Sequence, residues 1–268
     1  MRVNPFFAPD YAGIIEAMRF GEVHIAWYGN KAAIEAVDRA SGEVFAQQIA
    51  EDGSRGYWSL LIAHRDSPYH SIEDVKKNAR HITLGFGDSN STSGYLVPGY
   101  YAMALNGLDP KTSFKSMRQA NHEANLMAVA NRQVDVATNN NESLEKFARR
   151  HPERAKEIKV IWRSPLIPSH PMVWRTDLDP QLKARVKAFF VAYGRDERER
   201  QALRRIGISG FQESDNSQLL PVRQVELFRQ KLAVEQNATL SAAERQARLA
   251  DLDRRLAELA TQMAAARR

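Results

Sequence analysis

The sequence predicts an α/β protein made of two lobes, and three observations lead to this prediction. Short β-branched and aromatic runs alternate with helical patterns along most of the chain. A length of 268 residues allows one large domain or two lobes. Two segments, 81–84 and the proline-rich 164–171, are typical of crossings between lobes. We therefore expect mixed sheets flanked by helices.

The individual elements follow from periodicity. Apolar residues at helical spacing predict helices at 11–20, 31–39, 72–78, 94–105, 123–131, 142–150 and 180–193. Short apolar runs predict strands at 25–28, 57–63, 82–86, 114–117, 134–138, 159–162 and 172–175. Because helices separate these strands, parallel crossovers are expected. Residues 83–164 then form a second lobe inserted into a first lobe of residues 1–82 and 165–240, with a ligand cleft between them.

The C-terminal residues 241–268 have a different pattern. Ser241 and Glu244 have the spacing of a capping box, which predicts a helix start. Steps of three and four then join five apolar residues, as in a coiled-coil seam: Leu249, Leu252, Leu256, Leu259 and Met263. Such a short seam needs a partner, either the chain's own body or a second copy. We favour a homodimer through residues 241–268.

Composition excludes several classes of protein. The chain has no cysteine, which excludes disulfides, zinc–thiolate sites and thiol catalysis. Its net charge is +6, but basic residues mix with acidic ones on the predicted helices, so we expect no nucleic-acid partner. No apolar run is long enough to span a bilayer, and the first residues do not have the pattern of a signal peptide.

A run of three hydroxyl side chains marks the most informative junction. Ser91, Thr92 and Ser93 follow the strand at 82–86 and fall on the first turn of the next helix. Unpaired backbone N–H groups and the positive end of the helix dipole meet there, so the turn suits a tetrahedral oxyanion. The alternative is ordinary N-capping, for which one hydroxyl is enough.

Six sequence blocks, in order, resemble the periplasmic phosphonate-binding proteins of ABC importers. The blocks are Asp10-Tyr11-Ala12-Gly13, Ile25-Ala26-Trp27-Tyr28-Gly29-Asn30, Gly56-Tyr57-Trp58-Ser59, Asn90-Ser91-Thr92-Ser93-Gly94 with Val97-Pro98-Gly99-Tyr100-Tyr101, His122-Glu123, and Val134-Asp135-Val136-Ala137-Thr138-Asn139-Asn140. The resemblance implies a type II solute-binding fold, a periplasmic location, a phosphonate ligand and a membrane permease as partner. It implies no catalytic residue, metal or cofactor.

The resemblance also implies roles for individual residues. The phosphonate group would be bound by the three hydroxyls with two further side chains, Tyr11 and His122. A protonated His122 would add a charge-assisted hydrogen bond. The organic or amine end would lie against Tyr57 and Glu142. Other roles are open for these residues: Glu142 as a first-turn acid, Tyr57 as a core strand residue and His122 as a surface residue beside a helix N-cap.

Two features depart from the family pattern. His170 stands where the family usually has a second acid, and losing a charged hydrogen bond costs about 1.5–3 kcal/mol. We therefore expect weaker binding, or a shift toward phosphonates without an amine. The family also has an export signal, a strand and a helix before the point where this sequence starts, so we expect a truncated and less stable first lobe.

Two other functions and a metal site are alternatives to this prediction. A receptor for phosphite, phosphate or another small oxyanion would have the same fold, and Glu142 would disfavour a second negative charge. The stretch Phe86-Gly87-Asp88-Ser89 resembles the nucleophile block of GDSL hydrolases, but no histidine has an aspartate three residues before it. A metal site is not expected, since His64 with His70, or His122 with Glu123, lacks ligand spacing.

Overall fold

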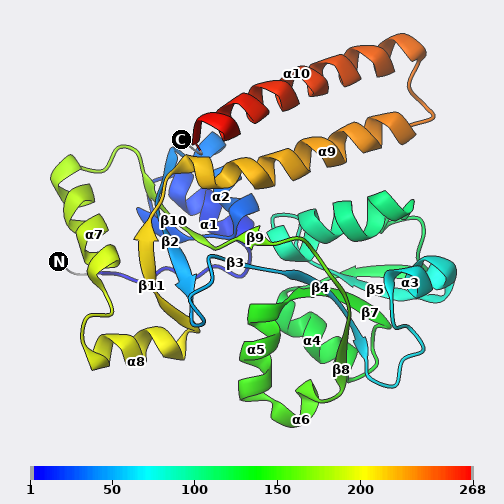
Figure 1. Cartoon of the computed structure of the whole chain (residues 1–268), viewed down its shortest axis with the longest axis horizontal. Coiled ribbons are helices and arrows are strands. Elements are labelled where there is room, and N and C mark those ends of the chain that lie inside the picture. The colour runs from blue at the N-terminus through cyan, green and yellow to red at the C-terminus, as the bar shows by residue number, and fades with distance from the viewer. Residues whose placement is uncertain (1–2, 267–268) are drawn as a thin grey trace. The chain divides into compact units, whose positions relative to one another are not determined.

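The computed structural model describes residues 3–266 and divides the chain into two units (Figure 1). The first unit contains the chain up to Tyr57 with 90–92 and 168–219; the second contains 58–89, 93–167 and the chain from Leu220. Residues 1–2 of the predicted first lobe and 267–268 of the predicted tail helix lie outside the described residues.

The first unit is an antiparallel sheet between two layers of helices. Its strand order is β1-β10-β2-β11, and all three pairings are antiparallel. Val44 and Val173 pack against α1 and α2, whereas Phe45 and Trp174 point to the opposite face with Val186 of α7. The bounds are α1 Tyr11–Arg19, β1 Ile25–Trp27, α2 Asn30–Arg39, β2 Gly42–Ala50, β3 Gly56–Tyr57, β10 Pro171–Arg175, α7 Pro180–Ala192, α8 Glu197–Arg205, β11 Ile208–Glu213 and η5 Asn216–Leu219.

The second unit has a mixed sheet of order β6-β5-β7-β4-β8. Strand β5 is parallel to β6 and β7, and β4 is antiparallel to β7 and β8. Figure 1 shows α4 and α5 on one face and the helical segment after β5 on the other. The bounds are β4 Ser59–His64, α3 Ile72–Asn78, η1 Ala79–His81, β5 Thr83–Phe86, η3 Gly99–Met103, η4 Ala104–Asn106, β6 Ser116–Gln119, α4 His122–Ala130, β7 Val136–Asn140, α5 Asn141–Arg150, α6 Pro152–Ala155, β8 Ile158–Arg163, α9 Leu220–Gln236 and α10 Ala242–Ala266. Two further elements, η2 Thr92–Leu96 and β9 Ile167–Pro168, each have one residue in the first unit and the others in the second.

The division of the chain differs from the predicted lobe boundaries. Residues 58–82 and 220–240 were expected in the first lobe, but both segments belong to the second unit. The reason is pairing between distant segments: β4 hydrogen-bonds to β7 and β8, and α9 packs on η3 and η4. The predicted parallel crossovers hold only for β5 with β6 and β7, because consecutive strands elsewhere are not neighbours in one sheet.

The helix that follows the hydroxyl run has an unusual backbone. Its segments η2 and η3 have π-type hydrogen bonding, and η4 closes it as a 3-10 turn. π-helical turns are rare and occur often at functional sites. The first residue of η2 is Thr92, so Thr92 and Ser93 lie on the first turn, as predicted.

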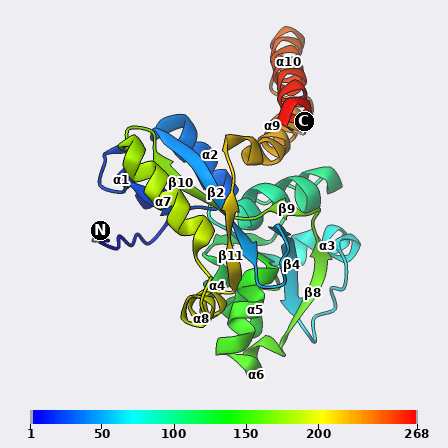
Figure 2. The same ribbon diagram turned by 60° about the vertical axis from the view of Figure 1, so that its left-hand side comes forward.

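The tail helix α10 packs on the chain's own body. It runs beside α9 as a hairpin in both views (Figures 1 and 2). The predicted capping box is confirmed: the Ser241 N–H donates to Glu244 Oε2 at 3.0 Å, and the Glu244 N–H to Ser241 Oγ at 3.3 Å. Leu252 and Leu259 are buried with Leu227 of α9. Four of the five seam residues, Leu252, Leu256, Leu259 and Met263, therefore pack in the cluster with α9, and Leu249 lies outside it. No helix within residues 3–266 combines the length and apolar character that a membrane crossing requires.

Candidate ligand-binding site

The end of β5 and the start of the next helix approach each other very closely. The Gly87 N–H donates to the Gly94 carbonyl at 2.9 Å. A Cβ on Gly87 would lie 2.6 Å from the Cα of Gly94, closer than real Cβ contacts. Ser91, Thr92 and Ser93 are each only 2% exposed. Glycine at position 87 thus allows the compact turn that brings three buried hydroxyls to one helix start.

In the first unit, Thr92 takes the place of a missing helix cap. Helix α2 has Gly29 at its N-cap, which offers no side-chain acceptor. Instead, Thr92 Oγ1 accepts the backbone N–H of Lys31 at 2.8 Å. A Cβ on Gly29 would lie 3.4 Å from Thr92 Oγ1 and 3.9 Å from Tyr11 Cε1. Thr92 and Tyr11, two residues predicted to bind the phosphonate group, therefore both border Gly29.

The first residues of α1 are fixed by local contacts that position Tyr11. Asp10 caps the helix, its carboxylate accepting the Gly13 N–H at 2.8 Å. The Tyr28 hydroxyl, at the end of β1, donates to the Ile14 carbonyl at 3.1 Å. Burial raises the pKa of Tyr28 above its ordinary value, so this phenol remains a donor across the neutral range.

In the second unit, Asn140 links two other predicted residues. Its side-chain Nδ2 lies 3.1 Å from Ser93 Oγ and 3.2 Å from His122 Nε2. Asn140 ends β7 and caps α5, and His122 is the first residue of α4. The carboxyl ends of neighbouring strands and the helices that follow them thus bring Ser93 and His122 together, although far apart in sequence.

The residues predicted for the organic end separate into two groups. Tyr57 is buried and stacks on the ring of His170, with centroids 4.5 Å apart and 29° between the ring planes. Both belong to the first unit. Glu142 belongs to the second unit, where it lies in the first turn of α5 beside the capping Asn140. The first-turn position expected for Glu142 is therefore confirmed, and its contact with the organic end of a ligand stays a prediction.

Several residues in these networks were not predicted from the sequence. The Ser59 hydroxyl donates to the Ser93 carbonyl and the Thr138 hydroxyl to the Gly94 carbonyl, each at 2.7 Å. Asn139 donates from its amide to the His122 carbonyl at 2.9 Å. The three consecutive asparagines 139–141, at the end of β7 and the start of α5, were a visible signal, because amides at a strand-to-helix turn are typical caps.

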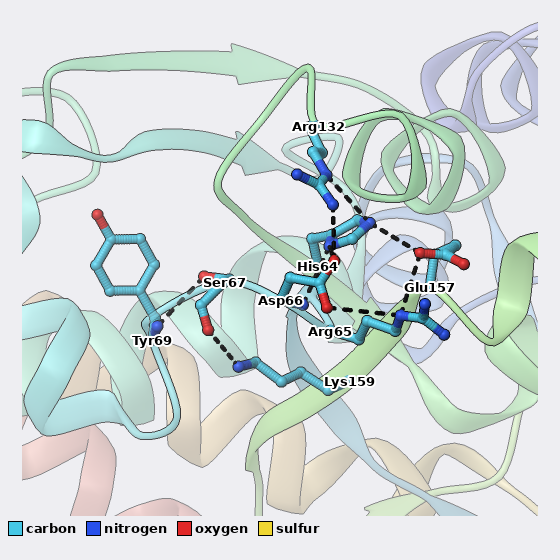
Figure 3. Close-up of polar contacts among 8 residues, drawn as sticks. All are labelled: His64, Arg65, Asp66, Ser67, Tyr69, Arg132, Glu157 and Lys159. Atoms are coloured by element: carbon cyan, nitrogen blue, oxygen red, sulfur yellow. Dashed lines mark hydrogen bonds and ion pairs between the residues drawn. The ribbon is translucent and has the colours of Figure 1, made fainter.

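A cluster near His64 is the candidate metal group among the described residues. His64, Asp66 and Glu157 bring three ligand atoms within 4.8 Å of one another. However, Figure 3 shows two arginines on the same carboxylates: Arg132 Nη2 lies 2.7 Å from Asp66 Oδ2, and Arg65 Nε lies 3.4 Å from Glu157 Oε2. These guanidinium charges would repel a divalent cation, so the cluster is better described as an ion-pair network.

The chain is similar to a known family of binding proteins. The family model described as the periplasmic substrate-binding protein of phosphonate ABC transporters matches residues 1–219. The chain is 51% identical over 261 residues to the phosphonates-binding periplasmic protein of Escherichia coli K12, covering 95% of this chain and 77% of that protein.

Two solved structures are also similar. A binding-protein component of an ABC phosphonate transporter from Pseudomonas aeruginosa has a TM-score of 0.96 and 54% identity, covering 98% of this chain and 87% of that one. A methylphosphonate complex from Prochlorococcus marinus shares the fold, with a TM-score of 0.73 and 20% identity over 83% of this chain and 85% of that one.

The fold is that of a type II solute-binding protein, as predicted. The chain belongs to the periplasmic substrate-binding proteins of ABC phosphonate transporters. This family consists of substrate-binding transport components rather than enzymes. Ser89, the nucleophile of the alternative hydrolase reading, lies exposed in the turn after β5.

Proposed function

We propose that this chain captures small phosphonates in the periplasm and delivers them to a membrane permease. Ser91, Thr92, Ser93, Tyr11 and His122 would bind the phosphonate group. The organic end would lie against three side chains, those of Tyr57, Glu142 and His170. The first unit contributes Tyr11, Ser91 and Thr92 to the phosphonate group, and the second contributes Ser93 and His122.

The hydroxyl of Thr92 is the observation that carries this proposal. Its oxygen accepts the Lys31 N–H, so its own proton is left to be donated elsewhere. The side chain is buried and lies on the first turn of a helix, where backbone N–H groups and the dipole favour an anion. A buried donor of this kind suits a ligand oxygen that carries negative charge.

The residues proposed to contact the organic end of the ligand favour phosphonates without an amine. His170 presents an imidazole stacked on Tyr57 rather than a carboxylate that could pair with an ammonium group. Glu142 then supplies the one acid among the residues proposed for this end. We expect methylphosphonate to bind at least as tightly as aminoethylphosphonate.

Calorimetric titration with methylphosphonate, aminoethylphosphonate, phosphite and phosphate tests both statements. We expect the variant His170→Asp to improve aminoethylphosphonate binding about ten- to hundredfold relative to methylphosphonate, as one charged hydrogen bond would. His170→Asn is the neutral control. Tighter binding of phosphate or phosphite than of either phosphonate would overturn the ligand class. Aminoethylphosphonate ahead by orders of magnitude in the unmodified chain would overturn the role of His170.

We also propose that two copies pair through residues 241–268, now as α9–α10 hairpins. The support is one partly exposed seam position: Leu249 is half-buried and borders a shallow groove with Ala242 and Ala250. We expect sedimentation equilibrium to give the mass of two copies. Leu249→Glu should give one copy with little change in melting temperature, because this side chain is outside the buried cluster. A single-copy mass for the unmodified chain would refute the pairing.

A further inference from the structure

The side-chain amide of Asn140 is shared by three neighbours in the second unit. Its Oδ1 accepts the Ser143 N–H at 2.7 Å, which caps α5. Its Nδ2 lies within hydrogen-bonding distance of both Ser93 Oγ and His122 Nε2. Asn140 is only 4% exposed, so its amide is largely shielded from solvent and bonds to these protein groups.

The orientation of this amide follows from its backbone partner. An N–H group can only donate, so the Asn140 atom that faces the Ser143 N–H must be the oxygen. The other atom is then the nitrogen, which can donate two hydrogen bonds and cannot accept one. These two hydrogens are directed at Ser93 Oγ and His122 Nε2, which must both accept.

Ser93 Oγ accepts a hydrogen bond from Asn140, and this restricts the direction of the Ser93 hydroxyl proton. The hydroxyl proton cannot point at Nδ2, because that would place two donors against each other. The backbone carbonyl of Ser93 already accepts the Ser59 hydroxyl at 2.7 Å. The Ser93 hydroxyl is thus set as a donor for another acceptor, as Thr92 is set by the Lys31 N–H.

For His122, the same amide decides the form of the ring. Nε2 can accept only if it keeps its lone pair, so the ring proton lies on Nδ1. A doubly protonated ring would place an N–H against the Asn140 N–H. His122 is therefore a neutral donor through Nδ1 in this arrangement, rather than the cation considered from the sequence.

We propose that Asn140 is a positioning residue that sets Ser93 and His122 as hydrogen-bond donors toward an oxyanion. This inference rests on the proposed function, because the acceptor it implies is the phosphonate group. Asn140 acts through its two partners. Two donors of this kind suit a ligand whose oxygens accept hydrogen bonds.

The variant Asn140→Asp tests this role with little change in shape. Aspartate also caps helices, so the bond to the Ser143 N–H is retained. Its second oxygen accepts only, so the Ser93 hydroxyl and the His122 ring would have to donate to it. We expect methylphosphonate affinity to fall at least about tenfold in calorimetric titration, the loss of one charged hydrogen bond or more.

The added negative charge needs its own control. Asn121→Asp places the same charge at the N-cap of α4, next to His122 in sequence, where the side chain is exposed and accepts the Ala124 N–H. We expect this variant to bind methylphosphonate within about threefold of the unmodified chain, as exposed charges interact weakly. An equal loss in both variants would overturn the positioning role, as would unchanged affinity in Asn140→Asp.

The ring form of His122 gives a readout that does not depend on a ligand. Nitrogen NMR shifts of the imidazole distinguish a proton on Nδ1 from one on Nε2. We expect Nδ1–H in the unmodified chain and Nε2–H in Asn140→Asp. A proton on Nε2 in the unmodified chain overturns the inference. If the chain binds none of the oxyanions, the proposed function fails, while the NMR result still decides whether Asn140 sets the donors.

Discussion

Alanine in place of Gly87 is expected to destabilise the second unit by about 3 kcal/mol or more and to abolish phosphonate binding. The added Cβ would lie 2.6 Å from the Cα and carbonyl carbon of Gly94 and 2.7 Å from its oxygen. These are backbone atoms, so no side chain can rotate away, and overpacking of this kind costs about 1–3 kcal/mol or more. The Gly87–Gly94 hydrogen bond and the helix start would have to separate.

The matched control for this variant is Gly99→Ala in the same helix. A Cβ there would meet Phe86 Cζ at 3.6 Å, an ordinary contact. Alanine also favours a helix over glycine by about 1 kcal/mol. Denaturant unfolding of both variants checks the prediction, with Gly99→Ala at or above the stability of the unmodified chain. Equal stability of Gly87→Ala and the unmodified chain would contradict the steric argument.

The substitution Thr92→Val is expected to lower phosphonate affinity about ten- to hundredfold. Valine keeps the shape of threonine but removes the donor proposed to face the anion, and a charged hydrogen bond contributes about 1.5–3 kcal/mol. It also leaves the Lys31 N–H without its acceptor, which costs about 1–3 kcal/mol of stability if the donor stays buried. Affinity and melting temperature should therefore fall together.

Thr92→Ser is the control, because serine keeps the hydroxyl and loses only a methyl group. Calorimetric titration with methylphosphonate should place Thr92→Ser much closer to the unmodified chain than Thr92→Val. If the valine variant binds methylphosphonate normally while its melting temperature falls, Thr92 is a helix cap only. The proposed role in the ligand site would then be wrong.

The hydroxyl run at a helix start was predictable because its signals are local. Ser91, Thr92 and Ser93 are adjacent, and the change from an apolar strand to helical spacing is visible within a few residues. The capping box of Ser241 and Glu244 is equally local, and both hydrogen bonds are present. The family resemblance added the other members of the predicted set.

Elements with mixed polarity were not predictable in the same way. Strand β2 was missed because its apolar pattern is interrupted by two buried glutamines, Gln47 and Gln48. The Gln48 N–H pairs with the His170 carbonyl, a partner far away in sequence. The predicted strand at 57–63 is in fact β3 and β4, which separate at Trp58 and belong to different units.

The sequence by itself determined the α/β class, the hydroxyl run at a helix start and the capped tail helix, because each depends on residues within one or two turns. Only the tertiary structure decided which distant residues complete them. It covers most of the seam of α10 with α9, and it brings Asn140 to Ser93 across 47 positions of the chain. The physical reason is that sheet register and helix packing select partners by burial and hydrogen bonding in space, which no local pattern specifies.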